Sequence, residues 1–233
     1  MVFGREPFAH FLPHFKHAAC LLHVFQFCFL LFSEQYNIFE IRNTYEINLY
    51  TEGRGNSTME LWDIYDKCFV KTGRTHVRGT PLNKGDYHLV VHIYPINSKG
   101  QILIQKRTKA VSWKPGYWAA TGGSAISGDD AWTTCRKELM EELGIEATRE
   151  NASLVLMYRR HDSFCAVWIV ITDVGIEELK LQPDEVETAK WVTREELKSM
   201  AEKGLMVNYF YLDFLLGMLE EEYGTVWNQK ASN

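Results

Sequence analysis

The chain lacks the cysteine patterns that would indicate a disulfide framework or a zinc site. It has five cysteines, which form no CxxC pair and do not lie beside a metal-type pair of histidines: Cys20, Cys28, Cys68, Cys135 and Cys165. An odd number of scattered thiols indicates reduced cysteines in an intracellular protein, and we expect a cytoplasmic location. Internal repeats and low-complexity tracts are absent too, so nothing indicates a repeat architecture.

An excess of positive charge is also absent. The chain has 25 Lys and Arg against 30 Asp and Glu, a net charge of -5 and a pI of about 5.9. A mildly acidic protein of this kind gives no reason to expect a nucleic-acid partner. An anionic ligand would need a local device, such as a divalent cation or a nest of backbone amides.

No apolar run is long enough to cross a bilayer. The candidate is ACLLHVFQFCFLLF at residues 19–32, which His23 and Gln26 interrupt. It falls short of the roughly 20 residues that a spanning helix needs. The following SEQYN has no small-x-small cleavage site, which argues against a signal peptide. We therefore expect no membrane partner.

The first 58 residues differ in composition from the rest and hold nine of the thirteen phenylalanines. From Met59 the sequence is that of an ordinary water-exposed domain. EGRG, shortly before Met59, can be encoded by a purine-rich run at the distance of a ribosome-binding site from a start codon. We expect residues 1–58 to be an N-terminal extension or translated leader, and residues 59–233 to form one domain.

Strands and helices alternate irregularly through residues 59–233. Turn signals at 83–86 and 97–100 flank the β-branched and aromatic run YHLVVHIYPI, and QILIQKR follows as its antiparallel return strand. The expected strands are 87–96, 101–107, 117–123, 153–160, 164–174 and 185–193, and the expected helices are about 130–143, 194–203 and 209–224. This pattern predicts an α/β or α+β fold with a mixed sheet.

Three glutamates share one face of the helix expected to end at Gly144. Glu138, Glu141 and Glu142 stand at positions i, i+3 and i+4, so their carboxylates repel one another. An exposed acidic face is the ordinary explanation of such a pattern. A hard cation is the alternative, because Mg²⁺ or Mn²⁺ binds oxygen ligands and relieves the repulsion.

The spacing around these glutamates favours the cation. The segment from Gly123 to Ile145 resembles the Nudix box, G-x5-E-x7-R-E-U-x-E-E-x-G-U, where U is aliphatic. Seven of nine defined positions match: Gly123, Glu138, Leu139, Glu141, Glu142, Gly144 and Ile145. Asp129 replaces the first Glu and Lys137 replaces the Arg. The resemblance covers about 59–223 and leaves out 1–58.

The resemblance implies a Nudix fold, with a mixed sheet between helices and the box on a loop-helix-loop. It implies that the glutamates bind Mg²⁺ or Mn²⁺, with Glu138 and Glu142 the first candidates for ligand or base, and Glu141 the next. The carbonyl of Gly122 is a further candidate ligand. A downstream acid often joins such sites, and Glu185 is the first candidate here, ahead of Glu187.

The same resemblance implies hydrolysis of a diphosphate bond in a nucleoside diphosphate linked to another moiety. Its partner would be a small-molecule diphosphate, and a homodimer is common in the family. Lys137 and Asp129 keep the charges of the pair that braces the box, but an ammonium replaces the planar fork of arginine. We expect a weaker brace and retained metal binding.

Residues 60–97 resemble the branch of the family that contains isopentenyl-diphosphate isomerase. That enzyme uses a cysteine and a histidine near the glycine strand, whereas YWAATGGSA has neither. Its histidine-rich metal site would retain at most His76 and His88. Alanine and glycine supply no general acid, so hydrolysis is favoured. A nucleotide-binding sensor without turnover is the second alternative.

Several other residues have two interpretations. His88 and His92 share one face of a strand, where hydrogen-bonded histidines are a simpler reading than a metal pair. Trp113 and Tyr117 would either stack on a base or cover the sheet, and Arg107 would either meet a phosphate or lie on the surface. The set Phe210, Tyr211, Phe214 and Leu215 fits a core or a dimer surface.

Overall fold

The computed structural model describes residues 59–230, and all of them belong to the unit Thr58–Asn233. The expected leader, the Phe-rich composition and the apolar run at 19–32 lie outside the described residues. The strands are β1 (Leu61–Tyr65), β2 (Lys71–Val77), β3 (His88–Ile96), β4 (Ile102–Arg107), β5 (Trp118–Ala119), β6 (Ala152–Arg159), β7 (Ser163–Ile171) and β8 (Val186–Val192). The helices are α2 (Ala131–Leu143), α3 (Arg194–Glu202) and α4 (Leu212–Lys230), with a 3-10 turn at Ile176–Glu178.

The central sheet is mixed, with the strand order β5-β4-β3-β7-β6 and β8 paired to β4. β3 and β7 run parallel in unbroken register from His88↔Ser163 to Ile96↔Ile171. β6 and β7 form an antiparallel hairpin. The mixed sheet expected from the sequence is confirmed.

The expected β3–β4 hairpin is only partly correct. The two strands pair at Ile96↔Ile102 and then separate. The freed edge of β3 is taken by the glycine loop, because the amides of Val91 and Ile93 donate to the carbonyls of Gly123 and Thr121, at 2.9 and 2.8 Å. This pairing places the two glycines of the loop beside the middle of β3.

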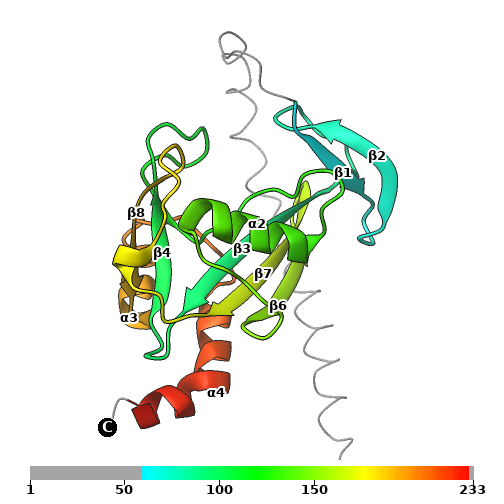
Figure 1. Cartoon of the computed structure of the whole chain (residues 1–233). Helices are drawn as coiled ribbons and strands as arrows, with labels where there is room; N and C mark the ends of the chain where they lie inside the picture. The colour runs from blue at the N-terminus through cyan, green and yellow to red at the C-terminus, as the bar shows by residue number, and fades with distance from the viewer. Residues whose placement is uncertain (1–58, 231–233) are drawn as a thin grey trace, which may run out of the picture. The chain divides into compact units, whose positions relative to one another are not determined.

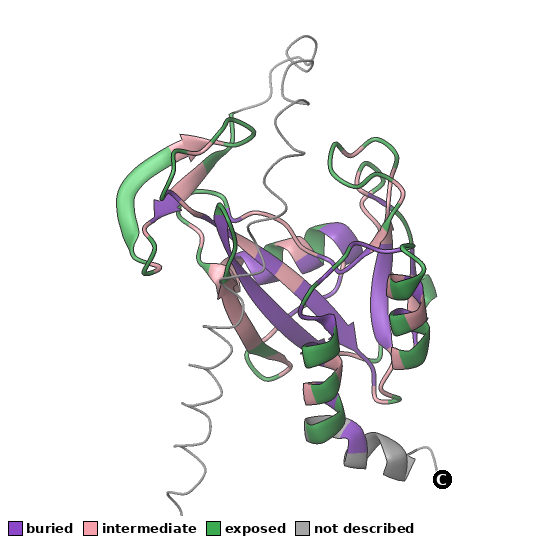
Figure 2. Ribbon diagram, turned by 180° about the vertical axis from the view of Figure 1, so that it is seen from behind, coloured by how far each residue is buried: buried purple, intermediate pink, exposed green. Residues whose placement is uncertain are grey.

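Helices cover both faces of the sheet (Figure 1). α2 packs against one face, where its core residues Cys135, Leu139 and Leu143 are fully buried beneath β3 and β7. α3 and α4 pack on the other face through residues such as Leu197 and Leu215. The central strands are consequently buried along most of their length (Figure 2). The expected arrangement of a sheet between helices is confirmed.

The caps of α2 follow the sequence signals. Asp130 is the N-cap, and its carboxylate accepts a hydrogen bond of 2.7 Å from the Thr133 amide. Gly144 ends the helix in the left-handed region at φ 71°, which glycine adopts without steric strain. These two caps fix the length of the helix, and therefore the position of the glutamates on it.

Two expectations need correction. The chain from Leu61 to Val77 forms a separate two-stranded sheet, β1–β2, which periodicity did not predict because β2 is largely exposed. The last helix begins at Leu212 rather than near 209 and continues to Lys230. Among residues 59–230, no helix combines the length and the apolar character that crossing a bilayer requires.

Candidate active site

Glu142 is the most buried acid of the site. Its side chain is on α2 and only 1% exposed. Oε2 accepts hydrogen bonds from the Gln105 side-chain amide at 2.9 Å and from the Gly122 backbone amide at 3.0 Å. Oε1 is also buried but has no hydrogen-bond partner among the described residues. A buried carboxylate oxygen without a donor is unfavourable, so this atom is suited to a cation or another ligand.

The environment makes both buried glutamates weak acids. Burial raises the pKa of Glu142 to about 7, against the opposing effect of its hydrogen bonds to Gln105 and Gly122. Burial also raises the pKa of Glu138 to about 8, and the charges of Glu142, Glu185 and Glu141 raise it further. These carboxyls therefore stay partly protonated near neutral pH, unless a positive charge joins them.

Close contacts at Gly122 and Gly123, the two glycines before α2, leave no room for a side chain at either position. A Cβ atom on Gly122, whose φ is 146°, would lie 2.1 Å from the Val91 carbonyl oxygen. A Cβ atom on Gly123 would lie 2.4 Å from Oε1 of Glu138. Gly122 therefore lets the loop approach β3, and Gly123 leaves room for the Glu138 carboxylate.

The pair expected to brace the box is present. The Lys137 ammonium lies 2.8 Å from one carboxylate oxygen of Asp129 and 3.0 Å from the other. The Lys137 side chain is 46% exposed and that of Asp129 is 14% exposed. The expectation of an ion pair is confirmed, and its exposure indicates a modest contribution to stability.

The remaining acids differ in whether their charges act on Glu138 and Glu142. Glu185 is partly buried just before β8, and its charge acts on both Glu138 and Glu142. Glu187, the second candidate, instead forms an ion pair with Lys106 at 2.7 Å. Glu141 is exposed, although its charge still reaches Glu138. The charge of Glu185 thus acts on Glu138 and Glu142, whereas Glu187 is paired with Lys106.

Basic and aromatic residues line the loop that follows β4. The Arg107 side chain donates to the Trp113 carbonyl at 2.9 Å and lies 5.4 Å from the centre of its ring. The positive charge of Arg107 also lowers the pKa of Glu142. Trp113 and Tyr117 are both exposed, at 49% and 38%, and so do not cover the sheet.

Sequence reasoning missed Gln105. Its side-chain amide donates to Glu142, while its carbonyl accepts a hydrogen bond from the Thr121 hydroxyl at 3.1 Å. The available signal was a neutral polar residue in an otherwise apolar stretch of strand. Such a residue is commonly exposed, but Gln105 is 1% exposed.

Among residues 59–230, the candidate histidines His76, His88 and His92 do not form a metal site. Nδ1 of His92 lies 2.7 Å from the Tyr211 hydroxyl, in the core beneath α4, and burial lowers the pKa of His92 to about 3. His88 stacks on Trp62 at 3.9 Å, and its Nδ1 has no partner among the described residues. The expectation of hydrogen-bonded histidines therefore holds for His92 and is wrong for Nδ1 of His88. His76 bonds to Thr80 and belongs to the hairpin.

The site offers carboxylate oxygens to a hard cation. In the described part of the chain, no three His, Cys, Asp or Glu side chains already converge on one point. The carboxylates of Glu138 and Glu142 nevertheless fit a divalent cation, because Oε1 of Glu142 lacks a donor and both pKa values are raised. All the donors are oxygens, which Mg²⁺ and Mn²⁺ prefer.

Comparison with known proteins places the chain in a family. Residues 86–210 match the NUDIX domain. The chain is 37% identical over 161 residues to the uncharacterized Nudix hydrolase lmo0368 of Listeria monocytogenes, covering 69% of this chain and 95% of that protein. It is also 37% identical to the uncharacterized Nudix hydrolase lin0387 of Listeria innocua, over 67% of this chain and 94% of that protein.

A solved structure agrees with the fold. The crystal structure of DR0079 from Deinococcus radiodurans matches with a TM-score of 0.56 and 21% identity, over 66% of this chain and 96% of that one. At this identity the likeness shows the fold alone. Together with the family match and the two relatives, the comparisons show that this chain belongs to the Nudix hydrolases, enzymes that cleave the diphosphate bond of nucleoside diphosphate derivatives.

Proposed function

We propose that residues 59–233 form a Mg²⁺- or Mn²⁺-dependent hydrolase, which cleaves the diphosphate bond of a nucleoside diphosphate linked to a second moiety. The observation that carries this proposal is the environment of Glu142. One of its oxygens is held by Gln105 and Gly122, while the other is buried without a donor. A side chain fixed in this way presents one oxygen in a defined direction.

Glu138 and Glu142 would hold the cation, with Glu141 and the Gly122 carbonyl as further ligands. When bound, the cation neutralises the diphosphate and polarises the phosphorus–oxygen bonds. Glu141 is exposed and is therefore the ligand that solvent reaches most easily. The Gly122 amide orients Glu142, and the loop pairing through Gly123 and Val91 keeps that amide in place.

The proton of the attacking water would pass to a carboxylate of the site. The candidates for this base are Glu138, Glu142 and the downstream acid Glu185. Glu185 is partly buried and its backbone carbonyl accepts a hydrogen bond from the Thr108 amide at 2.9 Å, which fixes the start of β8 beside the loop. Arg107 is the proposed phosphate contact, and its charge, which lowers the pKa of Glu142, supports a position near the acids.

The cytoplasmic location and the homodimer remain proposals. Cys68, Cys135 and Cys165 are free, which supports a reducing compartment. Phe210 and Phe214, 57% and 59% exposed, supply apolar area for a second copy.

The test is a screen of nucleoside diphosphate derivatives with Mg²⁺ and Mn²⁺, in which released phosphate or nucleotide is measured. We expect turnover by the native chain and a loss of at least about a thousandfold in Glu142→Gln. Glu187→Gln is the matched control, because it removes one carboxylate that lies outside the site. Equal turnover by Glu142→Gln and the native chain would refute the proposal.

The same samples separate the alternatives. Conversion of isopentenyl diphosphate without phosphate release would indicate the isomerase. Calorimetric binding of a nucleotide without turnover would indicate a sensor.

A further inference from the structure

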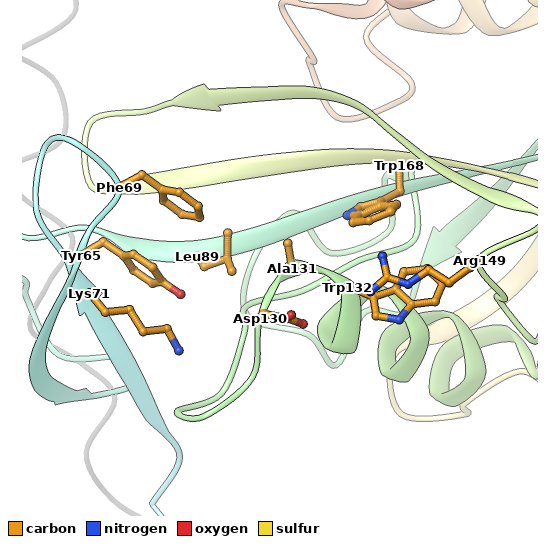
Figure 3. A pocket seen from close by; sticks show the side chains of 9 residues that line it. All are labelled: Tyr65, Phe69, Lys71, Leu89, Asp130, Ala131, Trp132, Arg149 and Trp168. Carbon is orange, nitrogen blue, oxygen red and sulfur yellow. The ribbon is translucent and has the colours of Figure 1, made fainter.

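A second cleft lies at the start of α2, away from the acids of the proposed active site (Figure 3). Its volume is about 370 Å³. Tyr65 and Phe69, from the β1–β2 hairpin, form one wall, and Trp132 of α2 forms the other. Leu89 and Trp168, from β3 and β7, form the base. The cleft contains none of the glutamates, and Ala131 at its edge lies about 16 Å along the helix from Glu142, at 1.5 Å per residue.

Trp168 carries a polar atom without a partner in this cleft. The residue is 5% exposed, and its Nε1 is buried without an acceptor in the described part of the chain. The ring nitrogen faces Leu89 and Ala131, which line the same cleft (Figure 3). By contrast, Nε1 of Trp191 donates to the Val174 carbonyl at 3.2 Å. A buried donor without an acceptor is uncommon, and a ligand acceptor would satisfy it.

The cleft also offers a cation that forms no close ion pair. The Arg149 guanidinium lies 4.3 Å from the centre of the Trp132 ring, and no ion pair joins it to an acid of residues 59–230. Its charge acts on Asp130, which also lines the cleft and whose carboxylate caps α2 by accepting from the Thr133 amide. Lys71, on the opposite wall, is different because it forms an ion pair of 2.6 Å with Asp63. Arg149 and Trp168 both contact Trp132, whose ring lies 5.4 Å from that of Trp168. An indole donor and a guanidinium therefore lie at the same end of the cleft.

We propose that this cleft binds an aromatic carboxylate, as a site separate from the diphosphate site. The ring would lie between the aromatic wall of the hairpin and Trp132, where offset or edge contacts are favourable. The carboxylate would accept from Nε1 of Trp168 and pair with Arg149. A neutral apolar occupant would leave both donors unmatched, and an anion without a ring would leave the aromatic walls uncovered.

The test uses the full chain labelled with ¹⁵N in its tryptophans, and follows the indole N–H signals by NMR during titration with benzoate. The spectrum of Trp168→Phe assigns the Trp168 signal. We expect a saturable shift of that signal with benzoate. Benzamide lacks the charge and cyclohexanecarboxylate lacks the aromatic ring, so we expect each to bind at least about fivefold more weakly, consistent with the loss of one favourable contact.

Two matched arginine variants test whether Arg149 supplies the positive charge that binds benzoate. Arg149→Gln should weaken benzoate binding about tenfold, the effect of one charge-assisted hydrogen bond. Arg136→Gln is the control, because Arg136 lies 5.9 Å over the same Trp132 ring but does not line the cleft. Benzoate affinity should be unchanged in Arg136→Gln.

The site is refuted by any of three results. These are no saturable shift of the Trp168 signal up to the solubility limit of benzoate, equal binding of the three probes, or equal losses in the two arginine variants. No diphosphate and no metal is added, so the outcome is independent of the proposed hydrolysis.

Discussion

The Gly122 amide donates a hydrogen bond of 3.0 Å to Oε2 of Glu142, twenty positions later in the chain. This contact joins the loop on β3 to the last turn of α2. The other oxygen of this carboxylate, Oε1, is a buried acceptor without a donor among the described residues. The orientation of one carboxylate thus depends on a backbone amide, which no side-chain substitution removes directly.

The effect of Mg²⁺ on stability should depend on pH. The folded-state pKa values of Glu142 and Glu138 are raised to about 7 and about 8, so the folded chain holds these protons more tightly than the unfolded chain. Their contribution to stability is therefore complete at low pH and is lost as the pH rises through 7 and 8. Mg²⁺ bound by the proposed ligands would replace the lost protons at high pH.

We accordingly expect Mg²⁺ to raise the Tm by about 2–4 °C more at pH 8 than at pH 5.5, the shift that about 1 kcal/mol produces in a domain of this size. Scanning calorimetry at both pH values, with Mg²⁺ or with a chelator, measures this difference in Tm. Glu142→Gln should reduce the difference between the two pH values. An equal effect of Mg²⁺ at both would contradict the proposed ligands.

The two loop glycines should respond differently to alanine. In Gly123→Ala the new methyl group meets the end of the Glu138 side chain, which is able to rotate away. We expect activity to fall at least about tenfold, since a proposed ligand is displaced, while the free energy of urea unfolding changes by less than about 1 kcal/mol.

Gly122→Ala is the comparison. Its methyl group would meet the Val91 backbone oxygen, and the backbone is not free to move. A loss of about 3 kcal/mol in the free energy of unfolding is expected. If Gly123→Ala proved as unstable as Gly122→Ala, the assigned roles of the two glycines would be wrong.

The Lys137–Asp129 pair should contribute little to stability. The Lys137 side chain is 46% exposed, so Lys137→Ala should lower the free energy of unfolding by less than about 1 kcal/mol. The double change Lys137→Arg with Asp129→Glu should raise turnover by less than a hundredfold. Denaturant unfolding and steady-state kinetics measure both effects. A larger gain would show that the present pair impairs the site.

Glu185 and Glu187 provide a matched pair of acids. Glu185→Gln removes a charge that acts on Glu138 and Glu142, so the pKa values of both should fall. We expect the acidic limb of the pH–rate profile to move to lower pH and turnover to drop at least about a hundredfold, as for loss of a general base.

Glu187→Gln breaks only the ion pair with Lys106 and should leave the pH profile unchanged. Retained turnover in Glu185→Gln with an unmoved profile would exclude Glu185 from the site.

Local signals in the sequence were sufficient for much of this fold. The helix expected at about residues 130–143, with its stop at Gly144, agrees with α2, because capping is decided by the few residues at a helix terminus; the structure shows that Asp130 is the N-cap. Cys135, Leu139 and Leu143 form the buried face of this helix. The β1–β2 hairpin was missed since its second strand is exposed and lacks a hydrophobic pattern.

Local sequence signals do not predict contacts between segments that are distant in the chain. Nothing near Gln105 indicates that it would meet Glu142, and nothing near Trp168 indicates that its Nε1 would lack an acceptor. The sequence ranks Glu185 ahead of Glu187, and the pairing of β8 with β4 adds a physical difference by placing Glu187 beside Lys106.

The sequence by itself determined the family pattern, the caps of α2 and the spacing that puts Glu138 and Glu142 on one face, because these depend on residues within a few turns of each other. Only the tertiary structure decided which oxygen of Glu142 lacks a donor, which downstream acid has a charge that acts on Glu142, and where the cleft at the start of α2 opens. These features depend on contacts between segments that are far apart in the chain: Gln105 and Gly122 meet Glu142 at the end of α2, and the β1–β2 hairpin, β3 and β7 meet the start of α2.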